Sequence, residues 1–155
     1  MGKKTWQEKL HDSKDLPKVV KIPEKMSKRW GNGTIVIPAP IEVDEIMNKV
    51  PFGKFITINQ IREILAKKHH ATIGCPITTG IFAKISAHAA EEMKAQWKKD
   101  ITPYWRTLKS NGELNEKYPG GIVSQKKLLE KEGHKIIQKG KKYIVANFEN
   151  WLVKF

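Results

Sequence analysis

The only thiol in the chain, Cys75, is the first residue to test for nucleophilic chemistry. A cysteine reacts as its thiolate, and a neighbouring charged partner lowers the pKa of the thiol. No charged residue is directly adjacent to Cys75, which lies in the short segment 71–76 (ATIGCP). We therefore expect a small apolar turn residue rather than a nucleophile. A single cysteine also excludes an intramolecular disulfide and is typical of a reducing compartment.

A second group of reactive side chains is formed by His88, Glu91 and Glu92, whose spacing brings them to one face of a helix. Such residues ligate metal ions, but a metal site needs three or four ligands that converge on one point. A histidine with one of these carboxylates supplies two. The sequence therefore predicts an ordinary helix surface here, with neither a metal ion nor another cofactor.

Three aromatic residues, Tyr104, Trp105 and Tyr118, offer a different chemistry. Aromatic side chains stack on nucleic acid bases and contribute about 1–3 kcal/mol per base. The same residue types also fill protein cores, and for Trp105 a core position and a pocket wall fit the sequence equally well. The sequence alone leaves both interpretations open.

The net charge favours the nucleic acid interpretation. The 155 residues include 29 Lys and Arg against 16 Asp and Glu, a formal net charge of +13. Such a surface attracts polyanions. Hydrophobic residues make up 39% of the chain, which is enough to form the core of one domain. Because no segment has the ~20 apolar residues of a membrane span or the apolar run of a signal peptide, we expect a cytoplasmic protein without a membrane partner.

The elements that must position these residues begin with three helices. Hydrophobic spacing predicts a first helix over 41–50, a second after the expected N-cap Thr57, and a third over 77–97. A tight glycine-containing turn between the last two is typical of a helix-turn-helix, although unrelated helical hairpins share this pattern. In such modules the start of the second helix approaches bases and phosphates. The predicted DNA contacts are Thr57, Asn59, Thr78, Thr79, Gly80 and Lys84, of which Lys84 fits an ordinary solvated lysine equally well.

Further elements flank the helix-turn-helix. Residues 1–40 carry nine Lys and Arg, four acidic residues and four prolines, which indicates a basic N-terminal arm that is either a solvated tail or partly ordered on the body. Residues 100–106 are predicted to be extended. Residues 135–145 alternate in polarity around Gly140 and predict a β-hairpin, which we expect to be the wing of a winged helix. The predicted fold is therefore α+β, with a winged helix-turn-helix-like domain over 41–155 after the basic arm.

Four segments, taken in order, resemble the DNA-binding domain of the methylguanine-DNA methyltransferases. Residues 51–61 (PFGKFITINQI) are similar to the start of that family's helix-turn-helix. Residues 103–106 (PYWR) stand where the family has its Pro-Cys-His-Arg active-site segment. Residues 118–121 (YPGG) match its Tyr-x-Gly-Gly loop, and residues 128–134 (LLEKEGH) match its Leu-Leu-x-x-Glu-Gly-His. Each motif alone is weak, and their shared order carries the resemblance.

The resemblance implies a site without its nucleophile. In this family a cysteine thiolate, activated by a Glu-His-water network, takes an alkyl group from a guanine flipped out of the duplex. Here Tyr104 stands at the cysteine position and Trp105 at the histidine position, while Glu132 and Arg106 match. A phenol with a pKa of about 10 cannot replace a thiolate in this transfer. We therefore expect no catalytic residue.

What remains of the family site is a pocket and a DNA contact. The resemblance implies a remnant pocket around Tyr104, Trp105, Tyr118 and Glu132, with Arg106 near the DNA. Two positions depart from the family: Ile58 stands at the base-flipping tyrosine and Gly80 at the arginine finger. The third helix is also longer than the family's, judged by motif spacing.

Three hypotheses follow. The favoured one is a monomeric, non-enzymatic protein of the alkyltransferase-like kind, which binds double-stranded DNA containing alkylated guanine and presents it to a repair protein partner. The second is a winged-helix transcriptional or architectural protein that binds DNA without recognising a lesion. The third is an enzyme that accepts the alkyl group on Cys75.

Overall fold

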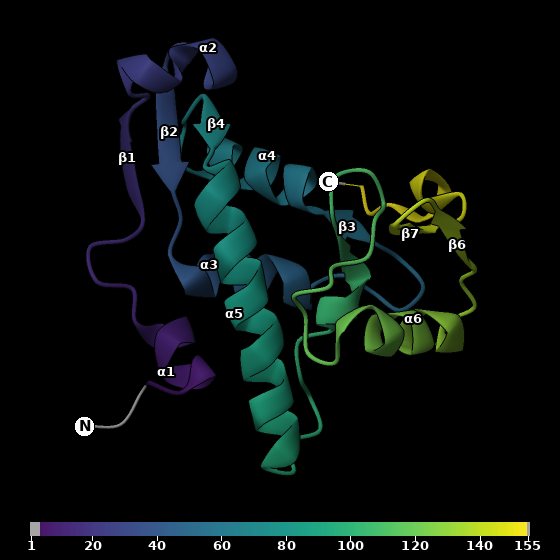
Figure 1. The fold of residues 1–155 in the computed structure, drawn as a ribbon. Coiled ribbons are helices and arrows are strands. Elements are labelled where there is room, and N and C mark those ends of the chain that lie inside the picture. The colour runs from purple at the N-terminus through teal and green to yellow at the C-terminus, as the bar shows by residue number, and fades with distance from the viewer. Residues whose placement is uncertain (1–3, 155) are drawn as a thin grey trace.

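The long helix α5 forms the centre of the fold, and smaller elements surround it (Figure 1). The structure, a computed structural model, describes residues 4–154. In chain order its elements, with η for 3-10 helices, are α1 (Trp6–His11), β1 (Lys18–Lys21), η1 (Glu24–Met26), α2 (Ser27–Trp30), β2 (Thr34–Ile37), α3 (Pro40–Asn48), β3 (Ile56–Thr57), α4 (Ile58–Lys68), β4 (Ile73–Gly74), α5 (Pro76–Ala95), η2 (Tyr104–Arg106), β5 (Thr107–Leu108), α6 (Gly121–Lys131), β6 (Ile136–Lys139), β7 (Lys142–Val145) and η3 (Phe148–Trp151).

The three helices predicted between residues 41 and 97 are present as α3, α4 and α5. Thr57 is the N-cap of α4, as predicted: its hydroxyl accepts a hydrogen bond from the Gln60 backbone, and the Gln60 side chain accepts one from the Thr57 backbone. This reciprocal capping satisfies two amides that a helix otherwise leaves unpaired. Helices α3, α4 and α5 bury Val43, Met47, Ile61, Leu65, Ala83 and Ala87 in one core.

The N-terminal segment packs on this body from residue 5 onward. Helix α1 lies along α5, and β1 and β2 form an antiparallel hairpin. Strand β2 also pairs in parallel with β4, the short strand between α4 and α5, through Ile35 opposite Ile73 and Val36 opposite Gly74. The part of the predicted arm that lies within 4–40 is therefore ordered, and it extends the helix-turn-helix by a three-stranded sheet.

The C-terminal hairpin forms as predicted, with Ile136 opposite Val145 in the β6–β7 pair. Its expected role as a wing is not confirmed, because it forms its own two-stranded sheet beside α6, away from α5 (Figure 1). The physical reason is its apolar face, which buries Val145 in a second core with Phe55, Leu108, Leu114 and Leu129. The strands that join the helix-turn-helix are β1 and β2.

The segment 100–106 is not fully extended, contrary to the prediction. After Pro103 the chain turns into the 3-10 helix η2, closed by a hydrogen bond from the Arg106 amide to the Pro103 carbonyl over 3.1 Å. Burial drives this turn, because it places the Tyr104 side chain in the central core with none of its surface exposed. Within residues 4–154, no helix is both long and apolar enough to cross a bilayer.

Candidate nucleic-acid interface

The first helix of the helix-turn-helix exposes one of its two predicted DNA contacts. Thr57 is only 3% exposed, and its hydroxyl is used in capping α4. Asn59, the second residue of α4, is exposed, and its side-chain oxygen accepts a hydrogen bond from Arg62 over 3.0 Å. The structure therefore places Thr57 as a structural cap and Asn59 at the surface.

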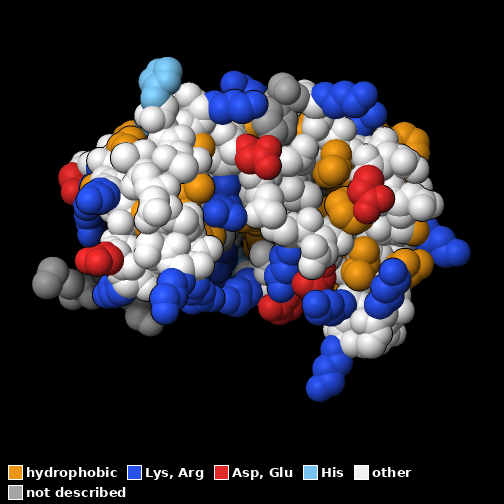
Figure 2. Space-filling view, turned by 90° about the horizontal axis from the view of Figure 1, so that it is seen from above, with side chains coloured by type: hydrophobic (Ala, Val, Ile, Leu, Met, Phe, Trp, Pro, Cys, Tyr) orange, Lys and Arg blue, Asp and Glu red, His pale blue; other side chains and the backbone are white. Residues whose placement is uncertain are grey.

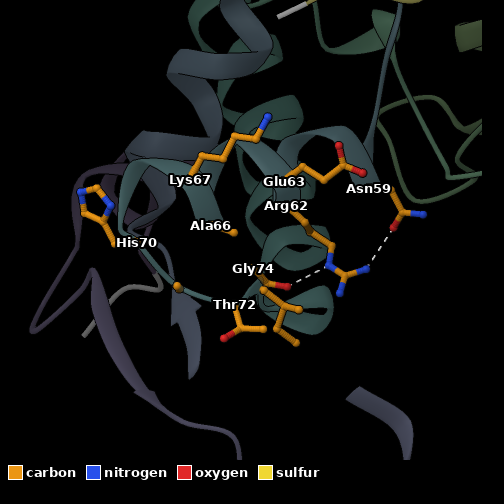
Figure 3. Close-up of a pocket in the computed structure, with 10 residues that line it drawn as sticks. Asn59, Arg62, Glu63, Ala66, Lys67, His70, Thr72 and Gly74 are labelled. Atoms are coloured by element: carbon orange, nitrogen blue, oxygen red, sulfur yellow. Dashed lines mark hydrogen bonds between the residues drawn. The ribbon is translucent and has the colours of Figure 1, made fainter. Parts of the chain in front are cut away.

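Arg62, which the sequence analysis did not single out, joins α4 to the turn before α5. Its Nε donates to the Gly74 carbonyl over 2.8 Å, and the same guanidinium reaches Asn59 (Figure 3). The two elements are in close contact, since a Cβ atom on Gly74 would lie 2.6 Å from the Arg62 carbonyl oxygen. The signal in the sequence was a basic residue at i+3 from Asn59, on the same helix face.

A groove of about 690 Å³ follows α4 and this turn (Figure 3). Its wall contains cationic and neutral polar groups as well as one carboxylate. The polar side chains that line it are Asn59, Arg62, Glu63, Lys67, His70 and Thr72. The charged groups of this groove are two cations, Arg62 and Lys67, and one carboxylate, Glu63, a balance that is compatible with a polyanion.

The start of α5 presents a different set of residues than predicted. Thr79 is fully buried and Thr78 is half-buried. Gly80 faces open space, because a Cβ atom built there would meet no atom within 4 Å. Ile77 and Ile81 are 57% and 49% exposed. The surface of this helix turn is therefore formed by glycine and isoleucine rather than by the two threonines.

Helix α1 covers the next stretch of the same helix face. The Trp6 ring stacks on His88 with 4.4 Å between ring centres. The ammonium groups of Lys9 and Lys84 lie 4.3 Å and 5.8 Å from the Trp6 ring centre, in the range of cation–π attraction. Lys84 therefore lies at the border between the exposed start of α5 and the part covered by α1.

The three side chains considered as metal ligands have separate structural partners. His88 Nε2 bonds the Lys117 carbonyl at 3.0 Å. Glu92 accepts hydrogen bonds from the backbone amides at the start of α1, and Glu91 accepts one from the Tyr104 hydroxyl. Across residues 4–154 there is no group of three His, Cys, Asp or Glu side chains arranged to hold a metal ion.

Two of the predicted pocket residues are enclosed by protein. Tyr104 has no exposed surface and Tyr118 is 3% exposed, and their rings pack edge to face with 5.6 Å between centres. The Tyr104 hydroxyl donates to Glu91 over 2.7 Å. Burial raises the pKa of the Tyr104 phenol, and the bond to Glu91 adds to this effect. Burial also raises the pKa of Tyr118. Neither ring presents a free face on which a base can stack.

Glu132, the acidic residue of the predicted pocket, is the centre of a hydrogen-bond network. Its carboxylate accepts from the Trp105 indole at 2.6 Å, from Arg106 Nε at 3.0 Å and from the Gly53 amide at 2.9 Å. Arg106 also donates to the Val50 carbonyl over 2.8 Å. The network joins η2, the loop before β3 and the end of α6. Arg106, which was predicted to lie near the DNA, therefore has a structural role within this network.

Cys75 lies in a different part of the molecule from this network. Its sulfur accepts a 3.5 Å hydrogen bond from the Thr78 amide as the N-cap of α5. It is buried in a small core with Ile22 and Ile35, whereas Tyr104 belongs to the central core. The expected role as a small, apolar residue of the turn agrees with this position.

Comparison with known proteins shows the fold. No family model and no curated protein sequence matches the chain. Two solved structures match it, one of S. pombe Atl1 in complex with damaged DNA containing O6-carboxymethylguanine and one of S. pombe ATL in complex with DNA. Each is 22% identical, with a TM-score of 0.53, and the match covers 74% of this chain and 94% of the other. The likeness supports the α+β fold over three quarters of the molecule.

Proposed function

We propose that this protein binds duplex DNA through α4 and α5 and acts in the recognition of damaged DNA without transferring an alkyl group. The observation that carries the proposal is a helix-turn-helix on a chain of net charge +13, in a fold shared with proteins solved on DNA. Under this proposal the protein works as a monomer and hands the DNA to a repair protein partner.

The start of α5 is the part we expect to enter a groove. Gly80 lets the backbone approach the duplex closely, because its Cβ position is open. The exposed Ile77 and Ile81 are the residue type that proteins press against base steps in the minor groove. The helix N-terminus attracts phosphate through its dipole. Asn59 and the groove along α4 would contact the adjacent backbone.

The environment of Tyr104 supports the proposal that no alkyl group is transferred. Its hydroxyl is a hydrogen-bond donor to Glu91, and its raised pKa keeps the phenol protonated at neutral pH. The carboxylate of Glu132 is already held by Trp105 and Arg106. Cys75 is separated from both, in the core beside the arm. The enzyme hypothesis based on Cys75 therefore lacks a base and an approach for the substrate.

Recognition of alkylated guanine is the finer part of the proposal, and it needs movement. Because Tyr104 and Tyr118 pack against each other, a flipped base would have to displace one of them or stack on the half-buried Trp105. The closed aromatic pair favours a second candidate function, DNA binding without lesion recognition, as in a transcriptional or architectural protein.

A titration with duplex DNA tests both the proposed DNA binding and the proposed lesion recognition. The wild-type protein should bind duplex DNA with an affinity that falls as salt rises, because phosphate contacts release counterions. Tighter binding to an O6-alkylguanine duplex than to the plain duplex supports lesion recognition, and equal affinities support the second candidate. Gly80→Glu should weaken binding to both duplexes, since it adds an anion at an open position of α5. Its matched control, Gly80→Ala, adds a side chain without charge; if the two variants bind equally well, α5 is not the interface.

A further inference from the structure

The hairpin formed by residues 18–37, which we call the arm hairpin, is joined to the turn that leads into α5. Two backbone hydrogen bonds, from Thr72 to the Thr34 carbonyl and from Cys75 to the Val36 carbonyl, continue the β2–β4 pairing to the residue before α5. Adjacent strands lie about 4.8 Å apart, so β1 is about 10 Å from the strand that positions the start of α5.

The contact between the arm hairpin and the turn before α5 is buried and tightly packed. Ile22, Ile35 and Cys75 form a small core between the arm hairpin and the turn, and Met26 and Trp30 pack against it. The approach is close at Gly33 as well, where a Cβ atom would lie 2.3 Å from the Thr72 hydroxyl. The arm hairpin therefore keeps a fixed position beside the helix-turn-helix.

The outer surface of the arm hairpin is cationic. Residues 18–37 contain five Lys and Arg and one acidic residue, Glu24. The five cationic residues are all exposed, and they are Lys18, Lys21, Lys25, Lys28 and Arg29. Lys18 is paired with Asp15 at 3.2 Å. Figure 2 looks down on the end of the molecule that carries α2 and β4, and Lys and Arg side chains line its rim and its central hollow.

We propose that the arm hairpin is a second DNA-contacting element, which binds the phosphate backbone flanking the groove entered by α5. In this proposal the arm hairpin has the role of a wing, which the sequence predicted for the C-terminal hairpin. The occupant is duplex DNA because the arm hairpin is joined through the β2–β4 pairing to the turn before α5, the helix proposed to enter the DNA groove, whereas β6 and β7 belong to a separate sheet beside α6. This inference rests on the proposed DNA-binding function.

The test compares two triple variants that remove the same charge. Lys21→Ala/Lys25→Ala/Lys28→Ala alters the arm hairpin, and Lys139→Ala/Lys141→Ala/Lys142→Ala alters the C-terminal hairpin; all six lysines are exposed. Binding to a plain duplex is titrated over a range of salt. The arm variant should lose about tenfold in affinity at low salt, and the slope of log K against log salt should fall by about 0.9 for each lysine that binds a phosphate. The C-terminal variant should change affinity less than twofold.

The outcomes separate this inference from the proposed function. Equal losses in both triple variants would show a diffuse charge effect and overturn the inference, as would wild-type affinity and slope in the arm variant. If Gly80→Glu weakens binding while the arm variant does not, the proposed function stands and the arm hairpin has no part in it. A wild-type protein that binds no duplex, or prefers single-stranded RNA, overturns both. Circular dichroism of each variant checks that the fold is retained.

Discussion

The indole Nε1 of Trp105 donates a hydrogen bond to the Glu132 carboxylate over 2.6 Å. In the family that the sequence resembles, the carboxylate at this position activates a nucleophile through a histidine. Here the histidine position is an aromatic hydrogen-bond donor, and Arg106 donates to the same carboxylate. Glu132 is here the acceptor that holds η2, the loop before β3 and the end of α6 together.

Glu132→Ala should therefore destabilise the fold strongly. The substitution leaves the partly buried Arg106 guanidinium and the Trp105 indole without their acceptor, and removal of one member of a buried ion pair costs about 3–5 kcal/mol. Because Arg106 keeps some contact with water, we expect about 3 kcal/mol in urea unfolding. Glu130→Ala, at an exposed position of α6, is the matched control and should change stability by less than about 0.5 kcal/mol. Similar losses in the two variants would contradict a special role for Glu132.

Tyr104→Cys should not create an alkyl acceptor. A thiol at this buried position has a raised pKa because apolar surroundings disfavour the thiolate. The position next to it is Trp105 rather than histidine, so no imidazole is available as the base. Incubation with a duplex containing O6-alkylguanine, followed by intact-mass measurement, should show the unmodified protein. A mass increase of one alkyl group would show that the site retains an activating base and an open path for the lesion.

His134 should make the protein less stable in mild acid. Burial lowers its pKa in the folded state, while the bond to the Gly53 carbonyl and the charge of Glu132 oppose this shift. Because the unfolded histidine, with a pKa of about 6.5, binds a proton more readily, stability falls as pH decreases through that value. Urea unfolding at pH 7.5 and pH 5.5 should show a larger decrease for the wild-type protein than for His134→Gln. An equal decrease would mean that His134 does not contribute.

Gly33→Ala should loosen the arm hairpin from the helix-turn-helix. Gly33 has a φ of +121°, and a Cβ atom would lie 2.3 Å from the Thr72 hydroxyl. That hydroxyl accepts a hydrogen bond from the Thr34 amide, so it cannot rotate away freely. Gly31→Ala is the matched control, since Gly31 has a φ of +81° with no atom within 4 Å of its Cβ position. Both variants bear backbone strain of about 1–3 kcal/mol, and Gly33→Ala should lose more stability than Gly31→Ala in urea unfolding because its Cβ atom also meets Thr72.

Local features of the sequence were sufficient for much of the helix-turn-helix. The capping pair Thr57 and Gln60 fixes the start of α4, and Gly140 between alternating residues produces the β6–β7 hairpin. These signals depend on neighbours a few residues apart, and their effect is therefore visible without the fold. The motif order also indicated a family whose members bind DNA, and the structural comparison supports that fold.

The residues that form the exposed surface of α5 could not be predicted from such local signals. Its place at the start of the second helix assigned Thr79 to the DNA, whereas the structure buries Thr79 and exposes the isoleucines beside it. Which side of a helix is covered depends on every element that packs against it, and here α1, α3 and α4 cover parts of α5 that a helix in isolation would expose. Arg62 was missed because its partner, the Gly74 carbonyl, lies on the far side of the turn.

The sequence by itself determined the charge, the helices with their caps, and the presence of Tyr104 where the resemblance implies a cysteine. Only the tertiary structure decided that Tyr104 is sealed in the core and that the N-terminal hairpin, not the C-terminal one, joins the helix-turn-helix. The physical reason is the same in both cases. Burial and strand pairing between segments far apart in the chain depend on which apolar faces meet, and a strand carries little information about its distant partner.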